Sequence, residues 1–294
     1  MMFMLLPYCD LHVHSDRSDG KLSLPALVAH ARENGIGVLA PTDHNTYSDL
    51  TALRAENPDM ILLDGMEASC GYTDLTGKRQ QPHIIGLGFD PAHGAMVELR
   101  SLCNPDRRPY NEEQLHALKK IGIDLGSYED LLARWPGRPQ IGTRQFAEEL
   151  VRFGYVGSVR EAYDRILGYE GTARVVNLLQ YPTVEQAVKA ILAAGGIPVL
   201  AHLFYYGWDH RDNHHFVGLF RELCGGFGGI ETAYGEYSPE EHERLREEFA
   251  KPYGLMESCA SDFHGVGLSP SDTLSSGFKR EDFRPILERL GAIP

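Results

Sequence analysis

Short apolar segments of β type alternate with helical segments along most of this 294-residue chain, and this alternation constrains its fold more than any other feature. The expected strands cover residues 8–12, 38–42, 61–68, 83–89, 197–201, 229–233 and 255–261. Helical patterns separate most of them, for example over residues 24–34, 184–194 and 239–250. Such alternation is typical of an α/β protein with a parallel sheet, either open or closed into a barrel. Because no helix separates residues 61–68 from 83–89, we expect these two segments to be antiparallel or to share a long hairpin.

Residues 97–171 have a different character. They are rich in Arg, Glu, Leu and Ala at helical spacing and contain no convincing strand. We interpret them as a helical subdomain inserted between the fourth and fifth strands. Residues 1–96 and 172–294 then form the α/β domain.

The composition excludes several classes of protein. With 43% hydrophobic and 23% charged residues, the chain is neither disordered, collagen-like nor a coiled coil. Its net charge of −13 argues against binding to duplex nucleic acid, but a metal cluster could still attract an anionic substrate. The apolar residues 1–7 are too few to cross a membrane, so we expect a cytoplasmic protein with no membrane partner. Five scattered cysteines without a CxxC motif argue against disulfides and against a thiolate zinc site.

Histidines and carboxylates gather at the ends of the expected strands. His12 and His14 lie two residues apart and therefore point to the same side of a strand, where both can bind one metal ion. An isolated HxH pair is as often a chance occurrence as a metal site. Here Asp19 follows in a turn closed by Gly20, which favours the metal site. Asp43, in the PTDHN segment, either caps a turn or orients a histidine.

Nine side chains in all are candidate metal ligands. They are His12, His14, Asp19, His44, Glu67, His83, His202, Asp262 and His264. One zinc ion takes about four ligands, so nine ligands predict two or three divalent ions with positions left open for water and substrate. Imidazole and carboxylate donors without thiolate favour Mn, Fe or Zn over Ca or Mg.

The motifs DLHVHS, SDG, PTDHN, GMEAS, HIIGLG, LAH and SDFHG, which span residues 10–265, resemble those of the polymerase and histidinol phosphatase (PHP) family. The chain is most similar to the family's stand-alone phosphoesterases, among them nucleoside 3′,5′-bisphosphate phosphatases. The resemblance implies a distorted seven-stranded β/α barrel with a trinuclear metal centre, with the inserted helices covering the active site.

The resemblance also implies a division of the ligands among three ions. His12, His14, Glu67 and Asp262 would surround the first ion, Glu67 would bridge to a second held with His83 and His202, and Asp19, His44 and His264 would hold the third. The implied reaction is hydrolysis of a small phosphate monoester, such as a nucleotide or a nucleoside 3′,5′-bisphosphate, by a metal-activated hydroxide. Asp19, His44 and His264 would serve catalysis on the side of the leaving group.

The substrate contacts are less well defined. Where similar proteins carry a Gly-Arg-Pro-His motif, this chain has Arg144 displaced by one position and Gln145 in place of the histidine. Arg144 and Arg138 are the candidate phosphate contacts, together with the pair at 78–79; the alternative is that these are solvated surface charges. The aromatic residues 204–208 would either stack on a base or pack against the inserted helices. Among residues 210–215, three histidines are surface groups or a weak accessory metal site.

Three other functions remain open. A histidinol-phosphate phosphatase would use the same metal core, and a panel of phosphomonoesters would distinguish it. A catalytically silent metal-binding module is disfavoured because all nine ligands are present. Hydrolysis of a non-phosphate ester would release no orthophosphate. The oligomeric state is not predicted.

Overall fold

The computed structural model describes residues 6–138, 140–168, 171–175, 180–267, 273–274 and 277–293. The chain divides into two compact units, one made of Met1–Cys103 with Tyr181–Pro294 and the other of Asn104–Gln180. Most of residues 1–7 lie outside the described ranges. Within those ranges, no helix combines the length and the apolar character needed to cross a membrane.

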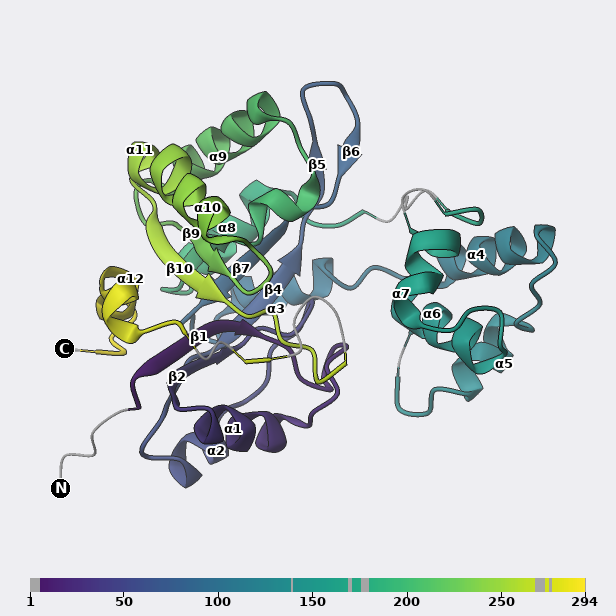
Figure 1. Ribbon diagram of the computed structural model, residues 1–294, viewed down its shortest axis with the longest axis horizontal. Helices are drawn as coiled ribbons and strands as arrows, with labels where there is room; N and C mark the ends of the chain where they lie inside the picture. The colour runs from purple at the N-terminus through teal and green to yellow at the C-terminus, as the bar shows by residue number, and fades with distance from the viewer. Residues whose placement is uncertain are drawn as a thin grey trace. The chain divides into compact units, whose positions relative to one another are not determined.

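The first unit is built on two open sheets (Figure 1). The parallel three-stranded sheet has the order β1 (Tyr8–Val13), β2 (Ile36–Pro41), β3 (Ile61–Leu62). The five-stranded sheet has the order β10 (Met256–Ala260), β9 (Gly229–Tyr234), β8 (Ile197–Leu200), β7 (His83–Leu87), β4 (Gly65–Ser69). β7 is antiparallel to both of its neighbours, which confirms the antiparallel option for β4 and β7. A hairpin of β5 (Tyr72–Thr73) and β6 (Arg79–Gln80) joins these two strands.

Each of the seven expected strands overlaps an observed strand, but the segment 61–68 breaks in two. The N–H of Leu63 still donates to the carbonyl of Leu39 in the first sheet, whereas the carbonyl of Asp64 accepts from Gly88 N in the second. The chain therefore passes from one sheet to the other within two residues. Gly65 permits this crossing, since a Cβ there would lie 2.5 Å from the carbonyl oxygen of Pro41.

Isolated backbone hydrogen bonds link the edges of the two sheets. The N–H of Asp262 donates to His12 O and that of His14 donates to Phe263 O, both at 2.9 Å; on the other side, Asn45 N donates to Glu67 O at 2.8 Å. The described strands do not form one closed barrel, so the expected seven-stranded barrel is not confirmed. The observed architecture is a mixed α/β fold.

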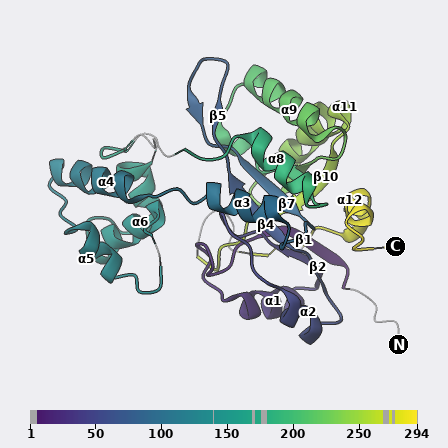
Figure 2. The ribbon, with the colours of Figure 1, turned by 180° about the vertical axis from the view of Figure 1, so that it is seen from behind.

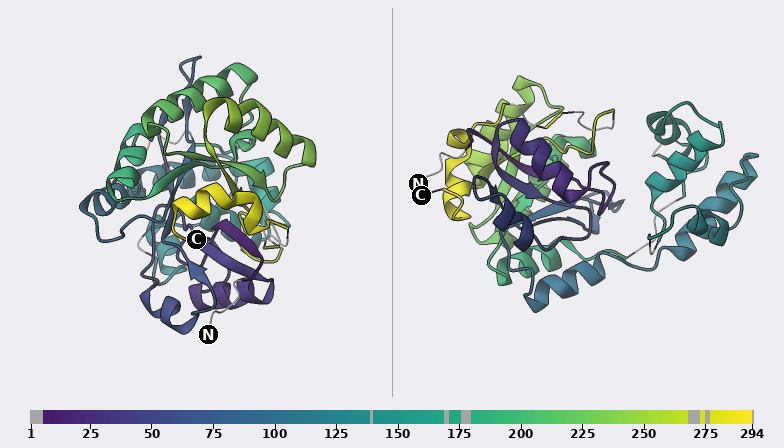
Figure 3. Two further views of the ribbon diagram at one scale, coloured as in Figure 1. Left: turned by 90° about the vertical axis from the view of Figure 1, so that its left-hand side faces the viewer. Right: turned by 90° about the horizontal axis from the view of Figure 1, so that it is seen from below.

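Helices cover the outer faces of the sheets. α1 (Leu24–Glu33) packs on β2, and α8 (Val184–Ala193) with α9 (His210–Cys224) covers β7 and β8 through a core that includes Val188 and Phe216. Seen from behind, α3 (Gly94–Leu102) and α8 lie in front of β4 and β7 (Figure 2). α12 (Arg284–Arg289) packs Ile286 and Leu287 into the apolar core between the sheets, near β10 (Figure 3). The remaining helices are α2 (Thr51–Glu56), α10 (Pro239–Arg244) and α11 (Lys251–Tyr253), with 3₁₀ turns at Leu203–Tyr206 and Arg280–Phe283 and a π-helical segment at Leu245–Ala250.

The described residues of the second unit form helices and no strand. They are α4 (Arg108–Lys120), α5 (Tyr128–Ala133), α6 (Thr143–Arg152), α7 (Val159–Ala162) and a π-helical turn at Tyr163–Leu167. These helices pack on a core of their own that contains Leu118, Phe146 and Leu150.

Candidate metal centre

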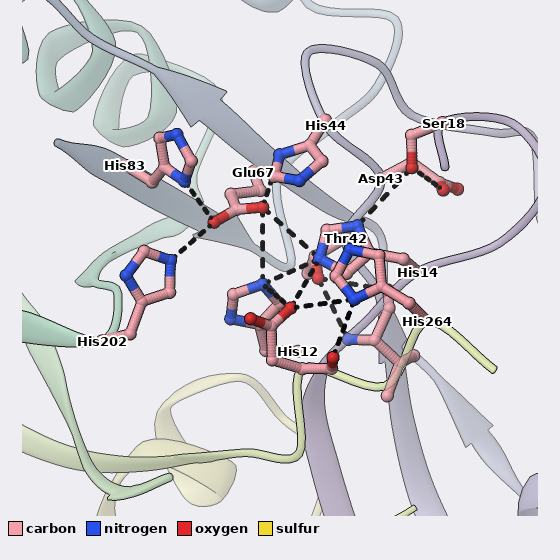
Figure 4. A network of polar contacts seen from close by, with 12 residues as sticks. His12, His14, Ser18, Thr42, Asp43, His44, Glu67, His83, His202 and His264 are labelled. Carbon is pink, nitrogen blue, oxygen red and sulfur yellow. Dashed lines mark hydrogen bonds and ion pairs between the residues drawn. The ribbon is translucent and has the colours of Figure 1, made fainter. Parts of the chain in front are cut away.

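The structure brings all nine candidate ligands into one network in the first unit. Figure 4 shows Glu67 and the histidines of this network. β1 and the residue after it carry His12 and His14, and the following turn carries Asp19. His44 follows β2, His202 follows β8, and Asp262 with His264 follows β10. Glu67 lies inside β4, and His83 is the first residue of β7. Because β7 is reversed, its start meets the same rim as the ends of the parallel strands.

Glu67 is the hub of this network. Its Oε1 lies 2.8 Å from His83 Nδ1 and 3.0 Å from His202 Nε2. Its Oε2 lies 2.7 Å from His44 Nδ1. The same oxygen lies 3.4 Å from His14 Nε2 and 3.5 Å from His12 Nε2. One carboxylate thus faces five imidazoles, with its two oxygens directed to different groups.

Two further carboxylates complete the centre. Asp262 Oδ1 lies 3.0 Å from His14 Nε2 and 3.4 Å from His12 Nε2. Asp19 Oδ1 lies 3.3 Å from His264 Nε2, and its Oδ2 lies 3.8 Å from His44 Nε2.

Three overlapping sets of side chains have the spacing of metal sites. They are His12, His14 and Glu67; His44, Glu67 and His83; and His14, Asp19, His44 and His264. These sets differ from the division implied by the family in that His14 also lies near Asp19, and His44 also lies near Glu67.

Several buried polar atoms in the centre have no hydrogen-bond partner. They are Glu67 Oε2, Asp262 Oδ1, Asp19 Oδ1 and His202 Nδ1. His44 Nδ1 is close to Glu67 Oε2, but the pair lacks the geometry of a hydrogen bond. Leaving buried carboxylate oxygens unsatisfied is costly, and bound cations would remove that cost. The donor set and its unsatisfied oxygens therefore fit divalent ions.

The carboxylates and imidazoles strongly perturb one another. Burial alone would lower the pKa of His44, but Glu67 and Asp19 outweigh it and raise that pKa to about 10. Burial and the neighbouring His264 and His44 lower the pKa of His14 to about 4. Burial would raise the pKa of Glu67, yet the surrounding histidines hold it well below its usual value. The carboxylates are thus ionised, and in the absence of metal some of the imidazoles carry protons that a metal ion would displace.

Glu231 in β9 supports two of the candidate ligands, and the sequence did not predict it. Its Oε1 accepts from His12 Nδ1 and its Oε2 accepts from the backbone N–H of His202, both at 2.7 Å. A neutral His12 that donates from Nδ1 presents the Nε2 lone pair to the centre. The only signal in the sequence was a carboxylate within an otherwise uncharged strand, which must have partners if it is buried.

Hydrogen bonds of three other residues, Tyr234, Tyr206 and Asp43, fix the shape of the centre. The hydroxyl of Tyr234 donates to Asp262 Oδ2 at 2.7 Å, which leaves Oδ1 directed at the histidines. The hydroxyl of Tyr206 accepts from His83 N at 2.7 Å. Asp43 accepts from the N–H and hydroxyl of Ser15 and from the hydroxyl of Ser18, so it holds the turn that carries Asp19.

The backbone is strained at this centre. Asn45, His202 and Asp262 have φ values of 58°, 29° and 53°, and among the described residues they are the only non-glycine residues with positive φ. Such conformations are costly and cluster at functional sites. Hydrogen bonds from their backbone N–H groups hold all three: Asn45 N donates to Glu67 O, His202 N to Glu231 Oε2, and Asp262 N to His12 O.

The predicted substrate contacts are not part of this network. Arg138 and Arg144 belong to the second unit, where Arg144 Nε pairs with Glu148 Oε1 at 2.9 Å. Lys78 and Arg79 lie on the β5–β6 hairpin. The role of these four residues stays a prediction.

Comparison with known proteins agrees with the motifs. Residues 10–133 match the model of the PHP domain. A 5′-3′ exoribonuclease of Haemophilus influenzae is 31% identical over 87% of this chain and 89% of its own length. A 3′,5′-nucleoside bisphosphate phosphatase of Chromobacterium violaceum is 30% identical over 94% of this chain and 93% of its own. A solved structure of an amidohydrolase from C. violaceum, with bound sulfate and no metal, superposes with a TM-score of 0.76 at 29% identity and covers 96% of both chains. These matches confirm the resemblance seen in the sequence: the chain belongs to the PHP family.

Proposed function

We propose that this protein is a metal-dependent phosphoesterase that hydrolyses a small phosphate monoester at the nine-residue centre. The observation that carries the proposal is the convergence of six histidines around three carboxylates, each of which has one buried oxygen without a hydrogen bond. Relatives named as a phosphatase and an exoribonuclease, both of which act on phosphate esters, support the same chemistry.

Two or three divalent ions, of Mn, Fe or Zn, would be held by the nine side chains. Glu67 is suited to bridging because its two oxygens face different histidines. The ions would supply Lewis acidity toward the phosphoryl oxygens and toward water. We retain the trinuclear arrangement, the barrel and the cytoplasmic location as parts of the proposal.

The protein's own groups position and neutralise the ligands. Glu231 holds His12 with Nε2 facing inward. The carbonyl oxygen of Asp262 accepts from His264 Nδ1 at 2.8 Å, which leaves Nε2 of a neutral His264 available toward Asp19. We assign Asp19, His44 and His264 to the side of the leaving group, where an ion held by these residues would stabilise negative charge on the departing oxygen.

A nucleotide is the substrate class we favour. Phe204, Tyr206 and Trp208 are partly buried and pack against the apolar core of the first unit. Tyr205 is 65% exposed, and its ring centroid lies 5.6 Å from that of His202. An exposed aromatic ring beside a candidate ligand can stack on a nucleobase whose phosphate reaches the centre. Arg138 and Arg144 stay our candidates for a second phosphate, with residues 97–171 proposed to cover the site.

A phosphate-release assay tests the proposal. Metal-depleted protein is reconstituted with Mn²⁺ or Zn²⁺ and given a nucleoside 3′,5′-bisphosphate, the matching 3′-monophosphate, a short 5′-phosphorylated RNA, histidinol phosphate and an aryl phosphate. We expect metal-dependent release that is fastest from a nucleotide. Preference for histidinol phosphate would select the alternative phosphatase, and no release from any ester would support the silent module.

A further inference from the structure

A second group of metal-binding side chains lies outside the nine-residue centre. His210 opens α9 and His214 follows one turn later, with their Nε2 atoms 3.1 Å apart. Glu248 comes from the π-helical segment Leu245–Ala250. One ligand atom from each of these three residues lies within 4.8 Å of the other two.

The contacts of His214 place Nδ1 beside the Tyr253 hydroxyl and Nε2 beside His210. The hydroxyl of Tyr253 donates its single proton to the carbonyl of His214 at 3.2 Å. With that proton on the carbonyl, Nδ1 is the donor in the 2.9 Å contact between the hydroxyl and His214; the other tautomer of His214 would reverse this contact. A neutral His214 then presents its Nε2 lone pair to His210, the arrangement found for histidines that bind metals. Burial and the nearby His210 also lower the pKa of His214, which favours the neutral ring.

Glu248 is ionised and held close by. Arg244 Nε and Nη2 lie 3.2 and 3.3 Å from its two oxygens, and this ion pair holds the pKa of Glu248 below its usual value. The Arg244 side chain is about half exposed and also lies over the ring of Phe204, 4.9 Å from its centroid. Arg244 thus competes with any cation for Glu248. When a cation displaces Arg244 from Glu248, its guanidinium still has the Phe204 ring as a partner.

We propose that His210, His214 and Glu248 form a separate site for a divalent ion of the zinc type, which would join α9 to the segment 245–250. Two imidazoles and one carboxylate are a typical ligand set for Zn²⁺, and histidines four residues apart lie on one face of a helix. A cavity lined by His210, Glu241 and Arg244 adjoins the site and has room for water at a fourth position. Glu248 lies in a π-helical segment, and such segments are frequent at functional sites.

Zinc binding to the whole protein tests this site directly. Equilibrium dialysis over a range of free Zn²⁺, followed by elemental analysis, gives the number of ions bound per chain. We expect His214→Ala to bind one equivalent fewer than the unmodified protein and to keep the metal content of the nine-residue centre. His215→Ala is the matched control, because His215 lies next on the same helix, is exposed, and is not one of the three residues.

Arg244→Gln provides a test in the opposite direction. Removing the competing guanidinium should tighten zinc binding at this site by about two- to fivefold, the range expected for one exposed ion pair. The proposal is wrong if all these variants bind the same number of zinc ions with the same affinity as the unmodified protein. His210 and His214 would then share only a hydrogen bond. Absence of an anomalous zinc peak between the Nε2 atoms in a crystal grown with zinc would also overturn the proposal. Phosphate release at the nine-residue centre is measured separately. If no phosphate is released, the zinc-binding measurements still test the site of His210, His214 and Glu248.

Discussion

Replacing Glu231 by glutamine should turn His12 into a poor metal ligand without moving it. Both oxygens of Glu231 accept, one from His12 Nδ1 and the other from the fixed N–H of His202. A glutamine has only one acceptor oxygen, and the N–H of His202 cannot change its role. The glutamine NH₂ group therefore faces His12, whose Nδ1 must become an acceptor and whose proton moves to Nε2, the atom that faces the centre.

The size of this effect follows from the two contacts that change. Loss of an outer partner of a metal ligand typically lowers metal affinity or activity by about 10–100-fold. One buried hydrogen bond to a charged group contributes about 1.5–3 kcal/mol, so some loss of folding stability accompanies it. We therefore expect the metal concentration for half-maximal phosphate release to rise by about 10–100-fold, with much of the activity recovered at high metal concentration.

Glu257→Gln is the matched control for this prediction. Glu257 lies on the neighbouring strand β10 and accepts from Thr232 and Arg246 rather than from a candidate ligand. The assay is phosphate release as a function of Mn²⁺ concentration, with thermal unfolding measured in parallel. The reasoning about the His12 tautomer is refuted if Glu231→Gln and Glu257→Gln show the same metal dependence as the unmodified protein.

Three other measurements follow from the structure. Tyr205→Ala should raise KM for a nucleotide by about tenfold, through loss of a stacking interaction of roughly 1–3 kcal/mol, and leave an aryl phosphate less affected; equal changes for both would remove Tyr205 from base recognition. Because the raised pKa of His44 keeps its ring protonated at pH 8 without metal, metal binding at pH 8 should release protons, seen by calorimetry in buffers of different ionisation enthalpy. The contribution of His44 to this release should disappear above its pKa of about 10, and the absence of any release at pH 8 would contradict the electrostatics. Gly65→Ala should destabilise the fold by about 1–3 kcal/mol in denaturant unfolding, whereas Gly94→Ala, with nothing within 4 Å of its new Cβ, should be close to neutral.

The sequence located the candidate ligands because strand geometry is simple. Residues at the carboxyl ends of parallel strands share one rim, so His12, His44 and Asp262 could be placed together without any tertiary information. His83 was harder, and its position followed from the antiparallel option for its strand. These inferences used only local periodicity and the order of the elements.

The features that were not predicted depend on contacts between distant segments. The split of residues 61–68 arises where Gly65 approaches the backbone of Pro41. The local pattern of residue types does not predict it. Glu231 gained its role from partners on β1 and after β8. Closure of the strands into a barrel depends on sheet edges that isolated hydrogen bonds join only in places.

Anomalous diffraction from crystals grown with Mn²⁺ tests the metal centre most directly. We expect two or three manganese peaks among the nine side chains, with one peak in contact with Glu67. Peaks confined to the surface, with no density between Glu67, Asp262 and the surrounding imidazoles, would contradict the proposed chemistry.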